Sequence, residues 1–504
     1  MGIFLFLLYT SIFLFLIRKM PFFALDGISK NSLSFFFLVK VFFGVALWWI
    51  YTYYYTERAT ADIYKYFDDS KVMYDALWVH PSDYIRMLFG FGNDNPYFDR
   101  VYYTHMNHWY HEFGNTIYND NHTIIRFNAF VRIFSFGHYN VHSVFMCFIS
   151  FIGLTAIYKT FEKQMPDKKR PLALAVFLVP SVLLWSSGVL KEGFLFFGLG
   201  LLLYHFHHCV FRQLNLKSFA WIVLALFLLM IAKFYVLACL GPGMMAWVVI
   251  RKRTNYITVI FSSLLVLLFI LALNLHFVLP KYDVLKQLAW KQSDFIAQSK
   301  GGTYLVDKLS GDTLFVDASE SKKIGWIKND SLAFLPGGLK YHTWKKRILS
   351  DPLFVESGLI DTCFFLKKYE AANSRITIAP LEPRLMSLFK NTPAAFLNSL
   401  LRPYPFESRS PMILFPAIEN MLILVFCLIC LFFGNFKKTD LKLFYFCAIF
   451  VFLLYVLTGL TTPVTGAIVR YRVPAVPFLL ITFLLLLDSE KLLKKFPLLK
   501  NFFG

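Results

Sequence analysis

The chain has 504 residues, of which 57% are hydrophobic and only 16% are charged, and its mean hydropathy is +0.54. These values exclude an ordinary soluble domain and indicate an integral membrane protein. The net charge of +20 does not indicate a nucleic-acid partner, because the basic residues cluster in short loops between apolar segments.

Eleven apolar segments are long enough to be membrane-spanning helices, since a hydrocarbon core of about 30 Å requires a helix of some 20 residues. In chain order they are residues 2–17, 33–54, 141–158, 171–188, 194–211, 218–236, 237–250, 256–279, 413–434, 442–460 and 474–488. The first has no basic start and no small-residue cleavage site, so we expect it to be a retained span. Gly241, Pro242 and Gly243 interrupt the sixth and seventh, which are either two short spans or one broken helix.

The distribution of Lys and Arg between the loops predicts the orientation of these spans. With the N-terminus outside, the short loops on the opposite side hold twenty basic residues: Arg18, Lys19, Lys30, Lys159, Lys163, Lys168, Lys169, Arg170, Arg212, Lys217, Arg251, Lys252, Arg253, Lys437, Lys438, Lys442, Lys491, Lys494, Lys495 and Lys500. The short loops on the N-terminal side hold four: Lys191, Lys233, Arg470 and Arg472. The bias assigns the first set to the cytoplasm.

The predicted fold is an all-α polytopic membrane protein of about eleven transmembrane helices with a small mixed α/β insertion on the outer side. Alternation of apolar and polar residues around Gly-Asp and Asn-Asp turns predicts strands over about 297–345, and a helical return to the membrane is expected over about 346–412. The chain then divides into two spans (1–54), an outer loop with interfacial helices (55–140), a transmembrane bundle (141–280), an outer domain (281–412), three last spans (413–488) and a basic cytoplasmic tail (489–504).

The first outer segment begins with acidic residues directly above a span. In "YFDDSKVMYDAL", Asp69, Met73 and Ala76 recur at helical spacing, which predicts an interfacial helix with Asp68 or Asp69 as its N-cap. Asp62 and Asp69 are the candidate catalytic carboxylates. The structural alternative, in which they only solvate an exterior helix, is left open by the residues alone.

Three short outer turns carry the cations that oppose the topology bias, and Lys233 lies in one of them, "IAKFYV". In "WSSGVLKEG", Lys191 is a candidate phosphate ligand, with Glu192 supporting it or acting as an alternative base; a hairpin with both charges at the lipid headgroups is the structural alternative. In "TGAIVRYRVP", Arg470 and Arg472 would point to one side if the stretch were extended, as a pair suited to phosphate. Interfacial snorkelling is the alternative. Lys233 and Arg402 complete the predicted set of cations.

The acidic loop after the second span resembles the first outer loop of the GT-C superfamily of polytopic glycosyltransferases. That superfamily often has the pattern D-x-x-x-Y-x-x-x-A, to which "DSKVMYDAL" (Asp69, Tyr74, Ala76) is similar with the spacing changed by one. The resemblance covers the general plan and this loop. It implies transfer of a sugar from a polyprenyl-phosphate carrier, in the outer leaflet of the membrane, to an acceptor glycan, lipid or protein, with the Asp at the reacting centre.

The "WSSGVLKE" and "RYRVP" segments also resemble those of bacterial membrane proteins, which implies a bacterial inner membrane with the active face outside. The implied chemistry requires a base for the acceptor hydroxyl and cations for the departing lipid phosphate. No ligand spacing demands a metal and no cofactor is implied, although a divalent cation bridging carboxylate and phosphate is compatible with the chemistry. The sequence leaves three other functions open: a glycan polymerase or ligase of the same carrier chemistry, a transporter or flippase, and a non-catalytic assembly component.

Overall fold

The computed structural model describes residues 1–504 with the exception of 57, 59, 60, 107, 110–119, 252–255, 280, 281, 308–312, 324, 329–331, 336–338, 344–352, 356, 357, 361–363, 370, 408, 409 and 501–504. Within the described residues, nine helical segments are long and apolar enough to cross a membrane. They are α1 (Gly2–Lys19), α2 (Lys30–Trp49) with the π-helical turn η2 (Ile50–Tyr54), α7 (Tyr139–Phe161), α10 (Lys191–Phe211), α11 (Leu216–Ile250), α12 (Ile257–Val278), α16 (Pro411–Phe432), α17 (Leu441–Thr461), and α18 (Thr465–Arg472) continuing through η9 (Val473–Ala475) into α19 (Val476–Leu486). The predicted class, a helical polytopic membrane protein with a small insertion, is confirmed.

Two differences reduce the eleven predicted spans to nine: the expected span 171–188 is not one helix, and the expected spans 218–236 and 237–250 both lie in α11. The expected span 171–188 is a pair of short helices, α8 (Lys169–Phe177) and α9 (Pro180–Trp185), separated at Leu178 and Val179. Proline lacks the N–H that would continue α8 and disfavours a helical conformation in the residue before it, so Pro180 starts a new helix. Neither piece is long enough to span a membrane alone.

Helix α11 contains both the sixth and the seventh predicted spans and is bent into a hairpin. Its backbone leaves the helical conformation at Lys233 (φ −156°, ψ 82°). Near the C-terminal end of α10, His205 lies 3.2 Å from the Ser218 hydroxyl, and the ring of His207 lies 5.3 Å from that of Trp247. Both ends of α11 therefore lie beside the same end of α10, with Lys233 at the apex.

The bend lies in the outer turn that the charge pattern assigns to Lys233, and not at the interruption formed by Gly241, Pro242 and Gly243. Gly241, Pro242 and Gly243 lie inside the second arm of α11, whose helix continues through them. Pro242 has no N–H to donate to the carbonyl four residues earlier, so the arm continues there without that one hydrogen bond.

Helices α7 and α10 cross in close backbone contact at two glycines. A Cβ added to Gly200 would lie 2.0 Å from the carbonyl oxygen of Gly153, and one added to Gly153 would lie 2.0 Å from that of Phe196. Small residues let two membrane helices bring their backbones into contact in this way. The position of α10, and hence of the charged residues at its N-terminus, depends on this contact.

Gly200→Ala is expected to lower the free energy of unfolding by about 1–3 kcal/mol or more, because the added methyl presses backbone against backbone. Gly241→Ala is the matched control: a Cβ there meets nothing within 4 Å, so alanine should be neutral or stabilise by about 0.5–1 kcal/mol. Unfolding of the two purified variants in the same detergent measures the difference. Equal stabilities would contradict this account of the helix crossing.

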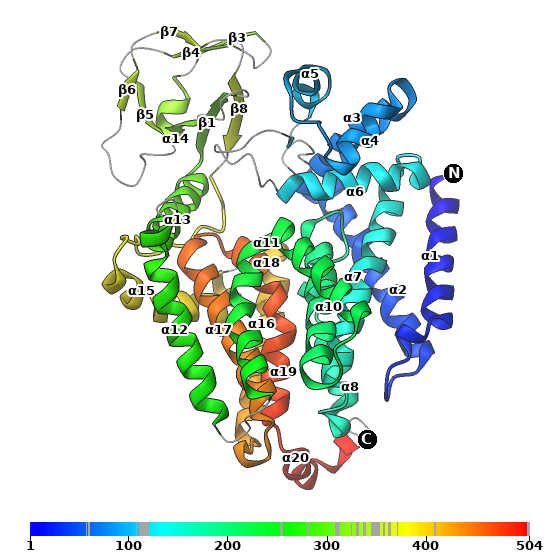
Figure 1. Cartoon of the computed structure of the whole chain (residues 1–504). Coiled ribbons are helices and arrows are strands. Elements are labelled where there is room, and N and C mark those ends of the chain that lie inside the picture. Colours follow the sequence, from blue (N-terminus) through cyan, green and yellow to red (C-terminus); the bar gives the residue numbers. More distant parts are fainter. Residues whose placement is uncertain are drawn as a thin grey trace.

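Two polar segments lie at one end of the bundle, opposite the short helix α20 (Ser489–Lys495), as Figure 1 shows. The first contains α3 (Asp62–Val79), α4 (Pro81–Phe89), α5 (Pro96–Val101), η3 (Tyr103–His105) and α6 (Asp120–Ser135). The predicted helix around Asp69 is thus present as α3, but the predicted N-cap is wrong. Ala61 precedes the first turn and Asp62 is its first residue, whereas Asp68 and Asp69 lie in the middle of the helix.

The second polar segment starts with α13 (Val284–Lys300) and continues into antiparallel strands. The strands are β1 (Gly302–Asp307), β2 (Thr313–Asp317), β3 (Gly325–Lys328), β4 (Leu332–Leu335), β5 (Leu339–Thr343), β6 (Leu353–Val355), β7 (Gly358–Ile360) and β8 (Phe364–Tyr369), with the short α14 (Ala318–Ser321) after β2. They form sheets of order β6-β5-β2-β1-β8 and β3-β4-β7. Strands therefore extend to Tyr369, well beyond the predicted limit at 345, and among the described residues of 346–412 the helical prediction holds chiefly for α15 (Leu385–Leu401).

Residues 371–384 join this domain to the bundle by crossing the turn between α17 and α18. The Ile376 amide donates to the Pro463 carbonyl at 2.8 Å, and the Thr465 amide donates to the Ser374 carbonyl at 2.9 Å. The buried Gln292 side chain of α13 donates to the carbonyls of Ala379 and Leu460, at 3.0 and 2.7 Å. These bonds fix the segment over the start of α18.

Candidate functional site

Four charged side chains from distant parts of the chain meet at the polar end of the bundle. Arg470 donates from Nε and Nη2 to the Glu192 carboxylate at 2.7 and 3.2 Å, and from Nη1 to Asp62 Oδ2 at 2.9 Å. Lys233 Nζ donates to Glu192 Oε1 at 3.1 Å. Asp62, Glu192, Lys233 and Arg470, here called the four-charge cluster, carry charges that cancel when all four are ionised.

Each member is positioned by the end or the bend of a helix. Asp62 is the first residue of α3, Glu192 the second of α10, Lys233 the apex of α11, and Arg470 lies near the end of α18. Charged groups at membrane depth require partners, and here one guanidinium binds two carboxylates. The topology alone predicts that Asp62 lies on the same side of the membrane as Glu192, Lys233 and Arg470.

Aromatic rings surround the cations of the cluster. The Arg470 guanidinium lies 5.2 Å from the ring centroid of Trp185, and Lys233 Nζ lies 4.8 Å from that of Tyr471. Cation–π contacts of this kind are stronger where water is excluded. The Trp of the "WSSG" segment therefore contacts the site directly, whereas the two serines that follow it are buried and bond to backbone carbonyls.

Lys191 and Glu192 do not act as a pair. Glu192 is fully buried, and its carboxylate binds Arg470 and Lys233. The Lys191 ammonium lies 5.4 Å from the ring of Tyr66 in α3. The sequence suggested that Glu192 supports Lys191, whereas in the structure the Glu192 carboxylate positions Arg470.

Exposure distinguishes Asp62 from the other members of the cluster. Its side chain is 38% exposed, against 16% for Arg470, 8% for Lys233 and 0% for Glu192. Burial raises the pKa of the Asp62 carboxyl, but Arg470, followed by His108 and Lys65, outweighs burial and holds that pKa below its ordinary value. Asp62 is the carboxylate of the cluster that an incoming molecule can reach.

The lowered pKa of Asp62 predicts a pH-dependent stability difference. A carboxyl with a depressed folded-state pKa contributes stability that is fully present above the unfolded value near 3.8, and that contribution is lost as the pH falls through the folded pKa. Asp62→Asn should therefore be less stable than the parent at neutral pH, with the difference shrinking only below pH 3.8. Unfolding titrations of both proteins across that range measure it; a difference independent of pH would contradict the assignment.

Asp69, the other predicted catalytic carboxylate, is buried. It accepts a hydrogen bond from the His108 amide at 2.7 Å and is only 1% exposed. It lies two turns, or about 10 Å, along α3 from Asp62. These contacts give Asp69 a structural position, in which it fixes the segment around His108 against α3.

Asp69→Ala is expected to lower the free energy of unfolding by about 1–3 kcal/mol, because the buried His108 amide loses its acceptor. Asp75→Ala is the control on the same helix, since that carboxylate is half-exposed and forms an exposed ion pair with Lys71, so its loss should change stability by less than about 0.5 kcal/mol. If the two substitutions are equally tolerated, Asp69 does not have the structural position inferred for it.

Arg472 and Arg402 are placed differently from the prediction. The stretch around Arg470 is helical, so residues two apart point about 200° from each other around the helix. Arg472 is buried and donates from Nη1 to the carbonyls of Ser399 and Arg402, where it caps the C-terminal end of α15. Arg402 forms an ion pair with Glu407 at 2.7 Å and is partly exposed.

A cavity of about 1680 Å³ lies beside the cluster, bounded by α2, α9, α16, α18 and the segment 373–377. Its lining includes apolar residues of two membrane-length helices and polar residues toward the outer domain. The charged lining residues are Arg375, Arg402, Glu407, Glu419 and Arg470. The apolar and aromatic lining includes Phe43, Ala46, Ile50, Tyr51, Tyr54, Tyr55, Leu184, Trp185, Phe415, Ile418, Leu422 and Tyr471. The cavity therefore has both an apolar wall and several cations.

Two cavity residues were missed from the sequence. Glu419 lies within α16 and accepts from the amide and hydroxyl of Ser181, at 2.6 and 2.5 Å, at the start of α9. Because acidic residues are rare inside apolar spans, Glu419 could have been identified from the sequence as a candidate site residue. Arg375 is held in place by the backbone bonds of the 371–384 segment, and no local sequence pattern predicts that this loop returns to the bundle.

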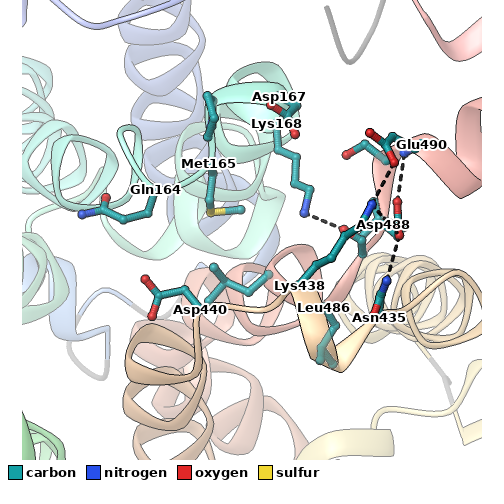
Figure 2. A pocket seen from close by; sticks show the side chains of 14 residues that line it. Gln164, Met165, Asp167, Lys168, Asn435, Lys438, Asp440, Leu486, Asp488 and Glu490 are labelled. Atoms are coloured by element: carbon teal, nitrogen blue, oxygen red, sulfur yellow. Dashed lines mark hydrogen bonds and ion pairs between the residues drawn. The ribbon is translucent and has the colours of Figure 1, made fainter. Parts of the chain in front are cut away.

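A smaller cavity of about 300 Å³ lies at the opposite end of the bundle, among three turns. Figure 2 shows Lys168 and Lys438 approaching the turn at Asp488. Lys168 donates to the Leu487 carbonyl at 2.5 Å, and Lys438 binds Glu490 at 2.8 Å. Its charged groups hold the turns together, and none of the predicted site residues lines it.

In the described part of the chain, no three His, Cys, Asp or Glu side chains are grouped to hold a metal ion. The cluster itself uses both of its carboxylates to bind Arg470. Comparison of the chain with known protein families, with curated proteins and with solved structures gives no match.

Proposed function

We propose that this protein is a membrane glycosyltransferase that takes a sugar from a polyprenyl-phosphate carrier and transfers it to an envelope glycan, lipid or protein on the outer face of a bacterial inner membrane. The observation that carries the proposal is the position of Arg470. It lines a cavity with walls from two membrane-length helices and also binds the accessible carboxylate Asp62.

The shape and lining of the cavity suit a lipid with an anionic head. Phe43 and Ile50 of α2, with Ile418 and Leu422 of α16, offer an apolar surface to a polyprenyl chain. Arg470, Arg402 and Arg375 offer donors to a phosphate, for which the guanidinium fork is well suited. Aromatic residues on the same lining, such as Trp185 and Tyr471, suit the face of a sugar ring.

Asp62 takes the role of base in this proposal. As the acceptor oxygen bonds to the anomeric carbon, the bond from that carbon to the phosphate oxygen breaks. The acceptor proton passes to Asp62, and the lipid phosphate leaves with the bonding electron pair. The charge that grows on the phosphate is stabilised by the arginines lining the cavity. The Asp62 carboxylate is a weak base while it binds Arg470. A phosphate that competes for the Arg470 guanidinium would release Asp62 and make the carboxylate a stronger base.

One observation favours a second candidate function, transport of a lipid-linked or charged solute. The chain has two discontinuous helices near one cavity: the break between α8 and α9, where Glu419 of α16 binds Ser181 in the first turn of α9, and the bend of α11 at Lys233. Discontinuous membrane helices with charged groups are typical of transporters. A glycan polymerase or ligase would use the same carrier chemistry as the first candidate.

The test is a glycan profile of cells that lack the gene, complemented with the parent protein, Asp62→Asn or Arg470→Lys. The proposal expects an altered profile in the deletion strain that the parent restores and Asp62→Asn does not. Purified protein should also release polyprenyl phosphate from a polyprenyl-phosphate-linked sugar. An unaltered profile, or full restoration by Asp62→Asn, would remove the glycosyltransferase function; carrier movement without cleavage would favour transport.

A further inference from the structure

The outer end of α2 has an unusual backbone in a run of aromatic residues, "WWIYTYYYTE". Residues Ile50–Tyr54 form a π-helical turn, in which the Tyr55 amide donates to the Ile50 carbonyl at 3.1 Å. A π-turn inserts one extra residue into a helix, which changes the direction of the side chains on it, and such turns are frequent at functional sites. The turn lies where α2 borders the large cavity.

Among the residues of this turn, Tyr51 is the candidate for a side chain that binds a ligand. It lines the same cavity as Arg470 and interacts electrostatically with Arg470, Asp62 and Glu192. Its neighbour Thr52 bonds to the Trp48 carbonyl at 2.7 Å, but the Tyr51 hydroxyl has no hydrogen-bond partner among the residues that the structure describes. A hydroxyl beside a cluster of charges therefore has a free donor and free acceptor positions.

The four-charge cluster itself explains why such a donor is needed. Three N–H groups of Arg470 are used by Glu192 and Asp62, which leaves two of its five N–H groups for an added ligand. An anion that approaches these two also approaches two carboxylates, which repel it. A neutral donor on the opposite side of the ligand adds a bond without changing the charge of the site.

We infer that the Tyr51 hydroxyl and Arg470 together bind one phosphate group, which is the headgroup phosphate of a prenyl lipid or a free phosphate. The inference rests on the proposed function, which places a carrier phosphate in this cavity. In this arrangement Tyr51 donates its O–H to a phosphate oxygen while Arg470 supplies two N–H groups. The π-turn is the backbone feature that places the Tyr51 side chain on the cavity lining.

The test measures binding of farnesyl phosphate to the detergent-purified full chain by isothermal titration calorimetry. Tyr51→Phe removes only the hydroxyl and should raise the Kd about 5- to 10-fold. Tyr53→Phe is the matched control, because Tyr53 lies on the same turn but is not among the residues that line the cavity; its Kd should change less than about 2-fold. Thermal unfolding of both variants should match that of the parent, since each keeps its ring.

Farnesol and inorganic phosphate separate the two sources of the phosphate. Weak binding of both, against tight binding of farnesyl phosphate, assigns the site to a lipid headgroup, whereas inorganic phosphate that binds as tightly assigns it to free phosphate. Loss of binding in Arg470→Lys with no change in Tyr51→Phe overturns the role of Tyr51 and leaves the proposed function intact. Failure of the parent protein to bind farnesyl phosphate, or equal binding by Arg470→Lys, overturns both.

Discussion

Replacing Arg470 with alanine is expected to lower the free energy of unfolding by about 3–5 kcal/mol, the range observed when one partner of a buried ion pair is removed. Glu192 is fully buried, and without Arg470 only Lys233 remains to bind its carboxylate. Asp62 loses its cation as well. The variant should unfold at a clearly lower temperature than the parent in the same detergent.

The double substitution Arg470→Met with Asp62→Asn identifies the cause of the loss. It neutralises the carboxylate that loses its cation, leaves the Glu192–Lys233 pair in place and keeps similar volumes, so it should recover a large part of the stability that Arg470→Ala loses. Arg402→Ala serves as the control, because the Arg402–Glu407 pair is partly exposed and should be worth less than about 1 kcal/mol. An Arg470→Ala variant as stable as Arg402→Ala would mean that the cluster contributes nothing to the fold.

The location of the site was predictable because topology alone groups residues by membrane side. Lys191, Lys233 and Arg470 stand out as basic residues on the side that the charge bias keeps nearly free of them. Asp62 was predictable as the first acid above a span. The structure brings Asp62 and Arg470 to 2.9 Å, so two segments about four hundred residues apart were assigned to one site without any contact information.

The roles of individual residues were less predictable, because they depend on local geometry. Asp69 was favoured by a family pattern, yet its helical phase buries it against the His108 amide. Arg470 and Arg472 were paired on the assumption of an extended backbone, whereas the helix separates them. For the two arginines the error is one of periodicity, because a period of 2 and a period of 3.6 send neighbouring side chains to different places.

The remaining differences come from long-range contacts that no local pattern encodes. Glu192 binds the Lys233 side chain at the bend of α11, and the helix continues through Gly241, Pro242 and Gly243, which the sequence suggested as an interruption. The strands after residue 345 pair with strands formed earlier in the chain, such as β8 with β1. Pairing between distant segments can override local propensity, so the sequence of this segment alone gave the wrong structure.

Gly466→Phe is expected to abolish the function of the cavity while leaving the fold intact. Gly466 lines the cavity one helical turn before Arg470, and residues four apart lie on the same face of a helix. A Cβ added there would meet only the Ser374 hydroxyl, at 3.9 Å. A phenyl ring would therefore extend into the space beside Arg470 and exclude a lipid phosphate from it.

Gly466→Ala tests whether occupied space, and not loss of glycine, causes the effect. Alanine should retain activity, since its methyl makes only an ordinary contact, whereas phenylalanine should reduce transfer by more than about 100-fold, as misplacement of a substrate by 1 Å already costs that much. Release of polyprenyl phosphate measures activity, and thermal unfolding shows that both variants are folded. A folded Gly466→Phe protein with parental activity would show that the reaction takes place outside this cavity, because no carrier phosphate could then reach Arg470.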